Sequence, residues 1–134
     1  MATIKIPISY GELADKLTIL EIKLERINDV GRLHNVRVEC DSLLPLWQPL
    51  EAKTAELAEL KAQLKAVNER MWDIQDALRD KEKAQMFDDE FVRLARAVAP
   101  TNGERVALKN TINRLAGSQL IEEKQYAGEG EAGA

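Results

Sequence analysis

The sequence has few of the residues from which catalytic and metal sites are usually built. Among its 134 residues there is one histidine, His34, and one cysteine, Cys40, and aromatic residues make up only 4%. A single cysteine cannot form an internal disulfide. One histidine and one cysteine are also too few ligands for the usual zinc sites. No glycine-rich phosphate loop is present. The sequence therefore assigns no catalytic residue, no metal ligand and no cofactor.

An excess of positive charge and a long apolar run are also missing. The formal net charge is −4 at pH 7, whereas a general nucleic-acid binder needs a dominant basic surface. No stretch approaches the roughly 20 apolar residues of a membrane span. The first residues do not resemble a secretory signal. These features predict a cytoplasmic protein without a membrane span that binds no nucleic acid.

Helical periodicity is what the sequence has in quantity. Between about residues 50 and 85, apolar residues recur at alternating steps of three and four, the spacing of a coiled-coil seam. The residues of this stripe are Leu57, Leu60, Leu64, Val67, Met71, Ile74 and Leu78. Such a helix would be on the order of 50 Å long, and its narrow apolar face needs a partner from the rest of the chain.

A second helical stretch offers that partner. Ser9 and Glu12 have the spacing of a capping box, and a further apolar stripe follows. Its members are Leu13, Leu17, Leu20, Leu24 and Ile27. The pattern breaks near Gly31, as in a bent helix or two helices in close succession, and then continues to Leu44. The prolines within residues 45–49 predict a turn.

Two stretches of nearly equal length, 9–44 and 50–85, predict a long antiparallel helical hairpin resembling a coiled coil. Residues 2–8 alternate isoleucine with polar residues, and we expect an extended arm that covers an end of the bundle. Residues 91–98 and 101–115 predict a short C-terminal helical pair at the open end, separated by Pro100. The whole is an all-α domain over residues 1–126, with a disordered tail at 127–134. Because narrow stripes leave apolar surface uncovered, we also expect a homodimer.

Acidic residues on this hairpin could in principle bind a metal. Asp73 and Asp76 share one face of the long helix, and the predicted hairpin brings the region of Asp15 beside that of Arg79. Acid pairs on facing helices can hold Mg²⁺. Spacings of this kind are common on soluble helices, however, so salt-bridged or solvated faces are the favoured interpretation. We expect Arg79 to pair with Asp15 or Asp76 in a charge cluster that borders any ligand site.

The candidate binding residues all fall at the open end of the predicted hairpin. They are Asp15, Lys16, Lys23, Asp73, Asp76, Arg79, Arg96, Arg105, Lys109 and Asn113.

Residues 11–23, with the sequence GELADKLTILEIK, resemble the opening signature of a small bacterial family known only as a domain of unknown function, family 6165. Blocks within 72–96 and 102–126 resemble it too. Gln75, Ala99 and Gly103 depart from the pattern, and the first weakens any metal hypothesis because an acid is expected there. The resemblance implies a link with envelope polysaccharide processes and brings no assigned activity.

Two functions follow from these patterns. The leading interpretation is a non-enzymatic interaction module whose open-end polar surface binds a protein partner or a small anionic ligand. The alternative is an all-helical enzyme acting on a phosphate or carboxylate small molecule, with Asp15, Asp73 and Asp76 holding a divalent metal or with an Arg/Lys cluster.

Overall fold

The structure is a computed structural model that describes residues 2–117. This part of the chain contains four helices and no strand: α1 Tyr10–Arg26, α2 Val30–Lys53, α3 Ala55–Ala84 and α4 Asp89–Ala116. The predicted all-α class is confirmed. None of these helices is long and apolar enough to cross a membrane. The tail predicted at 127–134 lies outside the described residues.

The helix ends follow the capping signals of the sequence. Ser9 Oγ accepts a hydrogen bond from the Glu12 backbone N–H at 3.1 Å, and Asp88 Oδ1 accepts one from the Phe91 backbone N–H at 2.9 Å. Gly117 ends α4 with φ at 73°, a left-handed conformation in which glycine has no Cβ to clash. The start of α1 and both ends of α4 therefore fall at residues that short-range sequence rules identify.

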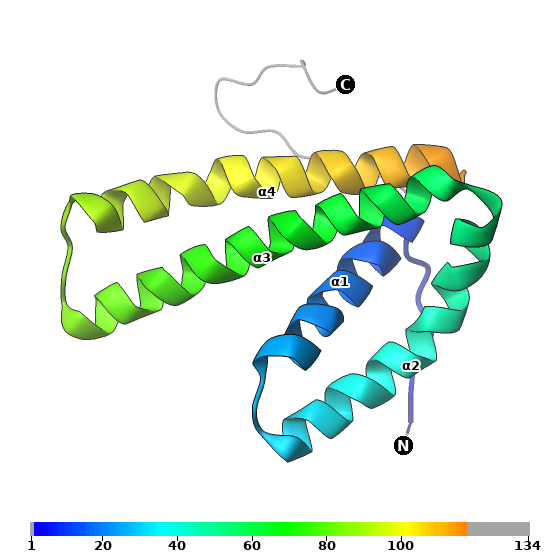
Figure 1. Ribbon diagram of the computed structural model, residues 1–134, viewed down its shortest axis with the longest axis horizontal. Helices are drawn as coiled ribbons and strands as arrows, with labels where there is room; N and C mark the ends of the chain where they lie inside the picture. The colour runs from blue at the N-terminus through cyan, green and yellow to red at the C-terminus, as the bar shows by residue number, and fades with distance from the viewer. Residues whose placement is uncertain (1, 118–134) are drawn as a thin grey trace.

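The four helices form two hairpins of unequal length (Figure 1). α1 folds back on α2 through a short turn after Arg26, and α3 folds back on α4 through a turn after Ala84. α4 lies along α3, and α1 packs across both of them. The far end of the α3–α4 hairpin projects beyond α1.

The prediction of a turn at residues 45–49 is wrong. Pro45 and Pro49 lie inside α2, which continues to Lys53. Proline removes one helical hydrogen bond and crowds the preceding turn, but here Trp47 lies between the two prolines and is buried in the core. Its indole N–H donates to Glu51 Oε1 at 2.5 Å, within the same helix. Burial of Trp47, together with the packing of Leu43, Leu44 and Leu50 against the core, favours a continuous helix here.

The predicted direction of the first helix is wrong for the same reason. α1 ends at Arg26, so the break near Gly31 separates two helices, and the chain turns a second time at Thr54. Two reversals leave α1 running in the same general direction as α3. The ion pairs Glu21–Lys61 at 2.5 Å and Glu25–Lys65 at 2.8 Å advance together along both helices. The open end of the predicted hairpin therefore does not exist.

The short C-terminal helical pair is also not formed. α4 is one helix from Asp89 to Ala116, with Pro100 inside it. Pro100 is exposed, so water can bond the carbonyl that the missing N–H leaves free. Packing of α4 along α3 on both sides of Pro100 keeps the helix continuous. Pro100 therefore does not separate two helices.

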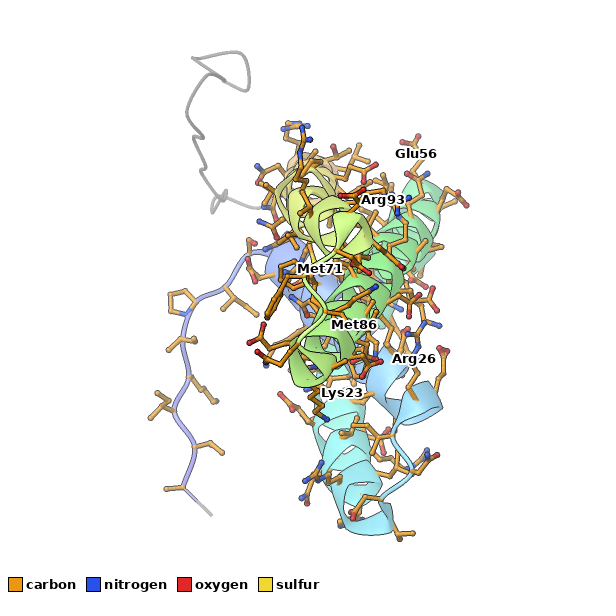
Figure 2. The ribbon with its side chains drawn as sticks, turned by 90° about the vertical axis from the view of Figure 1, so that its left-hand side faces the viewer. Lys23, Arg26, Glu56, Met71, Met86 and Arg93 are labelled. Carbon is orange, nitrogen blue, oxygen red and sulfur yellow. The ribbon has the colours of Figure 1, made fainter. Side chains whose placement is uncertain are left out.

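Residues 2–8 form an extended arm that does not cover the bundle, contrary to the prediction. Ile4 is 88% exposed and Ile6 is 67% exposed. Figure 2 shows this arm running away from the helices, with its side chains in open space.

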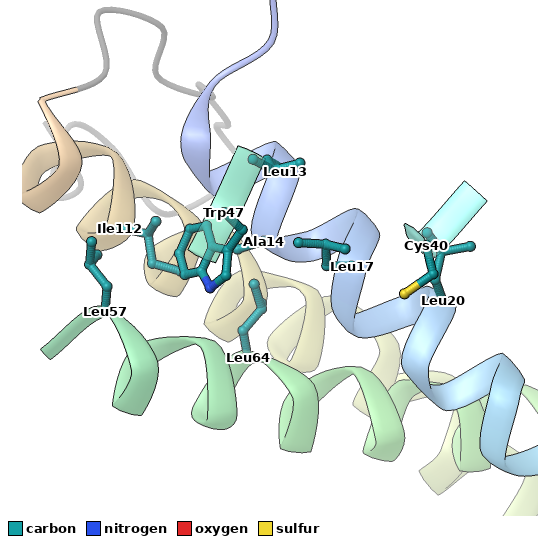
Figure 3. Packing of buried hydrophobic residues seen from close by; sticks show 9 residues of the cluster. All are labelled: Leu13, Ala14, Leu17, Leu20, Cys40, Trp47, Leu57, Leu64 and Ile112. Atoms are coloured by element: carbon teal, nitrogen blue, oxygen red, sulfur yellow. The ribbon is translucent and has the colours of Figure 1, made fainter. Parts of the chain in front are cut away.

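The core lies where the four helices come together (Figure 3). Leu17 of α1, Trp47 of α2, Leu64 of α3 and Ile112 of α4 are all almost completely buried. The predicted burial of the seam residues is confirmed for most of them, although the antiparallel hairpin that was expected to bury them is not formed. Leu20, Leu64, Val67 and Met71 are buried, and Leu24 is partly buried against the core. Cys40 is buried in the same cluster, as its place on an apolar stripe predicted.

Leu64→Ala should destabilise the protein by about 2–5 kcal/mol, because it leaves a cavity at a fully buried position. Leu46→Ala is the matched control, since Leu46 is 60% exposed on α2 and its truncation should cost less than about 0.5 kcal/mol. Chemical denaturation of both variants measures the difference. Equal effects would contradict the assignment of Leu64 to the core.

Candidate functional site

α1 and α4 approach each other closely at Gly11. Its backbone N–H donates to Asn113 Oδ1 at 2.6 Å, in a buried bond between residues 102 positions apart. A Cβ at this position would overlap the Lys109 carbonyl oxygen and lie 2.8 Å from Asn113 Oδ1. Only glycine fits, because the side chain of any other residue would push the helices apart.

Asp15 is the buried acid at the centre of this contact. It is 4% exposed and receives two hydrogen bonds from Arg105 of α4, Nε to Oδ1 at 2.8 Å and Nη2 to Oδ2 at 2.5 Å. This two-point geometry holds the carboxylate in a fixed plane and makes a strong, directional pair. The register of α1 against α4 is therefore set by a charge pair as well as by packing.

Asn68 connects the same acid to α3. Its Nδ2 donates to Asp15 Oδ1 at 3.0 Å and to Thr18 Oγ1 at 2.9 Å. The Thr18 hydroxyl in turn donates to the Asp15 carbonyl oxygen at 2.8 Å. Three helices thus converge on one carboxylate and its own backbone.

Lys109 forms the second charge pair between α1 and α4. Its side chain is almost fully buried, and its Nζ lies 2.6 Å from Glu12 Oε1. Gly11, Glu12, Asp15, Thr18, Asn68, Arg105, Lys109 and Asn113 make up what we call the polar junction. Every buried side-chain nitrogen and oxygen in the described part of the chain has a hydrogen-bond partner.

The pKa of Asp15 is shifted below its ordinary value. Burial by itself raises the pKa of this carboxyl, but hydrogen bonds from Arg105 and Asn68, with the positive charges of Arg105 and Lys109, outweigh it. Asp15 is therefore ionised at neutral pH and acts as a hydrogen-bond acceptor. A carboxylate held in this way is a poor general acid.

The structure distributes the other predicted site residues over separate places. Lys16 pairs with Glu39 of α2 at 3.0 Å. Asp73 pairs with Arg26 at 2.5 Å near the end of α1, where the Arg26 guanidinium also lies 5.9 Å from the Trp72 ring. Lys23 is partly exposed on α1. These residues do not join the polar junction.

The predicted charge cluster around Arg79 is only partly formed. Arg79 does bond Asp76, but both side chains are exposed and lie within one helix. Asp15 pairs with Arg105 instead, because α1 runs alongside α3 in the same direction. Asp15, Asp73 and Asp76 do not come together as a metal site, and residues 2–117 contain no group of three or more acidic, histidine or cysteine side chains that could hold an ion.

Arg96 lies on a different face of α4. With Arg93 and Asp89 it borders a surface hollow of about 590 Å³, whose other described lining residues are Val92 and Ala97. Arg93 and Arg96 have no ion-pair partner within residues 2–117. Both are exposed in the first half of α4.

Sequence reasoning missed Gly11, Glu12, Thr18 and Asn68 as members of the site. Asn68 follows Val67 within the apolar stripe of α3, and a polar residue beside a buried stripe position is a recognisable signal. Gly11 stands in the first turn of a helix, where its low helix propensity needs a packing reason. Both signals are visible in the sequence, but their shared location depends on the fold.

Fold and site together define a small all-α protein whose central charges hold its helices together. Its chain belongs to the Family of unknown function (DUF6165), whose family model matches residues 4–131. No curated protein and no solved structure matches the chain. The block at 11–23 that resembled this family supplies Gly11 and Asp15, and the block at 102–126 supplies Arg105, so the two blocks meet in the polar junction.

Gly11→Ala should destabilise the protein by about 2 kcal/mol or more, although alanine is the better helix former by about 1 kcal/mol. The added Cβ meets the Lys109 carbonyl oxygen, which belongs to backbone and cannot easily move. Gly103→Ala is the control, because nothing lies within 4 Å of a Cβ there. It should stabilise α4 by about 0.5–1 kcal/mol. Thermal and urea unfolding test both, and a neutral Gly11→Ala would contradict the close approach.

Asp15→Asn should cost about 3 kcal/mol at pH 7, since it leaves Arg105 without its counter-charge. The pKa of Asp15 is lower in the folded than in the unfolded protein, so its stabilisation is complete at neutral pH. It is lost as the pH falls below about 4 and passes through the lowered pKa. The gap in unfolding free energy between wild type and variant should therefore narrow on acidification. A gap independent of pH would show that the charge of Asp15 is not responsible.

Proposed function

We propose that this protein is a non-enzymatic interaction module that binds a protein partner through the projecting end of the α3–α4 hairpin. The observation that carries the proposal is a group of exposed apolar side chains at that end. Met86 and Val92 are each 50% exposed and Phe87 is 55% exposed. Clustered apolar exposure on a soluble domain is typical of a binding surface. We call residues 86–92 the hairpin tip.

The hairpin tip has a defined shape. The Phe87 and Phe91 rings meet edge to face with their centroids 5.2 Å apart. Lys81 bonds Asp88 at 2.8 Å and Glu90 at 3.2 Å, and thereby connects the end of α3 with the start of α4. A surface that is already ordered loses less entropy on binding. Aromatic side chains in such surfaces often contribute most of the affinity.

The polar junction is less suited to binding than the hairpin tip, because its charges are already paired. Asp15 is held by Arg105 and Asn68, and Lys109 is held by Glu12. Charges committed to one another are poorly available to a substrate, and displacing them would separate the helices. The projecting end of the molecule therefore suits a binding surface better than its charged centre does.

A small anionic ligand is the second candidate. It is favoured by Arg93 and Arg96, one helical turn apart beside the surface hollow on α4. Paired arginines of this kind suit a phosphate or carboxylate group. The link with envelope polysaccharide processes, the bacterial source and the cytoplasmic location stay predictions from the sequence.

A photo-crosslinking amino acid placed at position 87 should give discrete protein adducts in cells of the source organism. The same group at position 38 is the control, because Val38 is 57% exposed on α2, which is far from the tip. Met86→Asp in the same chain should weaken the adducts about tenfold by placing a charge in the apolar surface. Adducts of equal yield at both positions, or none at 87, would contradict a binding role for the tip.

The second candidate is separated from the first by thermal unfolding with added ligands. A protein-binding tip predicts no rise in Tm with pyrophosphate or Mg²⁺. A rise with pyrophosphate that is lost in an Arg93→Ala, Arg96→Ala variant would favour the anion site instead.

A further inference from the structure

We propose that the hairpin tip binds the extended arm of a second copy of this chain, so that two chains exchange arms in a homodimer. This inference rests on the proposed role of the hairpin tip and names its partner. The arm and the tip each bring three exposed apolar side chains close together in the sequence: Ile4, Ile6 and Ile8 in the arm, and Met86, Phe87 and Val92 in the tip.

The arm presents an apolar side without a partner in its own chain. Residues 2–8 are extended, and in an extended chain Ile4, Ile6 and Ile8 share one side. All three are exposed, and Figure 2 shows the arm apart from the helices of its own chain. The family model matches from residue 4 onward, so the three isoleucines lie within the matched residues. An apolar strip of this kind needs a surface to cover it.

The arm cannot reach the tip of its own chain. Gly11 is anchored on Asn113 of α4, and the helix between Asn113 and Asp89 is about 36 Å long at 1.5 Å per residue. A fully extended chain from Gly11 back to Ile4 spans at most about 25 Å. A contact between arm and tip therefore has to join two molecules.

Arm and tip are complementary in both surface and charge. The isoleucines of the arm match Met86, Phe87 and Val92 of the tip in apolar character. Lys5 lies between two of the isoleucines, and Asp89 lies between the two acids that Lys81 already binds. Within residues 2–117 neither Lys5 nor Asp89 has an ion-pair partner. Lys5 lies on the other side of the extended arm from the isoleucines, so its long side chain would reach Asp89 at the edge of the contact.

Pairing of two arms with each other is less favoured. Pro7 lacks the backbone N–H that a strand ladder needs, and an isolated two-stranded ribbon is marginally stable in water. Exchange of arms instead repeats one heterologous contact twice around a two-fold axis, which closes the assembly at two copies.

Sedimentation equilibrium of the full chain at tens of micromolar should give twice the mass of one chain. Ile6→Asp in the arm or Phe87→Asp in the tip should each raise the dimer dissociation constant about tenfold or more. Both positions are exposed, so the helical content and Tm of the monomer should be unchanged. A wild-type monomer at this concentration would overturn the inference.

Mixing the two variants gives the decisive readout. The Ile6→Asp chain keeps its tip and the Phe87→Asp chain keeps its arm, so one of the two contacts can form. The mixture should therefore dimerise more strongly than either variant alone. Absence of this recovery would overturn arm exchange even if the wild type is a dimer.

Disulfide trapping locates the contact directly. A chain with Ile6→Cys and a chain with Phe87→Cys, oxidised together with copper phenanthroline, should form a mixed dimer. Ile6→Cys with Val38→Cys should not. Cys40 does not compete, because it is buried and burial raises the pKa of its thiol. The remaining outcome is crosslinked adducts at position 87 with a different protein and no trapped dimer. It would overturn the inference that the tip binds a second copy, and the hairpin tip would still be a binding surface.

Discussion

The structure depends on the burial of one negative charge. Asp15 is ionised inside the molecule, and a buried carboxylate is tolerated only when opposite charge and hydrogen bonds compensate for lost water. Arg105 supplies the charge, Asn68 supplies a further donor, and each comes from a different helix. The requirement to satisfy this group fixes where α3 and α4 cross α1. Gly11 then permits the backbones to approach closely enough for the bonds to form.

The same requirement divides the molecule into two parts with different tasks. Near the polar junction the helices are held by buried side chains and by hydrogen bonds between them. Beyond α1, the α3–α4 hairpin is held by its own packing and by Lys81 at its end. The charges of the polar junction neutralise one another, which suits a part that holds the helices in place. The exposed apolar side chains of the hairpin tip suit a contact surface. The proposed function assigns each part the task that its chemistry fits.

Short-range signals in the sequence predicted the helical class, the cap at Ser9 and the burial of the apolar stripe through Leu64. The Ser9 cap and the stripe through Leu64 need only neighbouring residues, so local rules suffice for them. The prolines led to a wrong prediction of where the chain reverses its direction. Whether Pro45 ends a helix depends on the burial of Trp47, which is a tertiary effect. With the turn misplaced, Arg79 was expected near Asp15 as well as near Asp76, and the pairing of Asp15 with Arg105 was not predicted. The residue types of the site were therefore partly identified, but their partners required the fold.

The bond between Gly11 and Asn113 joins residues near the two ends of the described chain. Contacts so distant in sequence form late, since the intervening chain must first be ordered against its loop entropy. During synthesis, α1 emerges first and its buried acid has no arginine until α4 has left the ribosome. The first helix must therefore wait for the last one. A chain interrupted before Arg105 would expose an amphipathic helix and hairpin, a species that chaperones and proteases recognise.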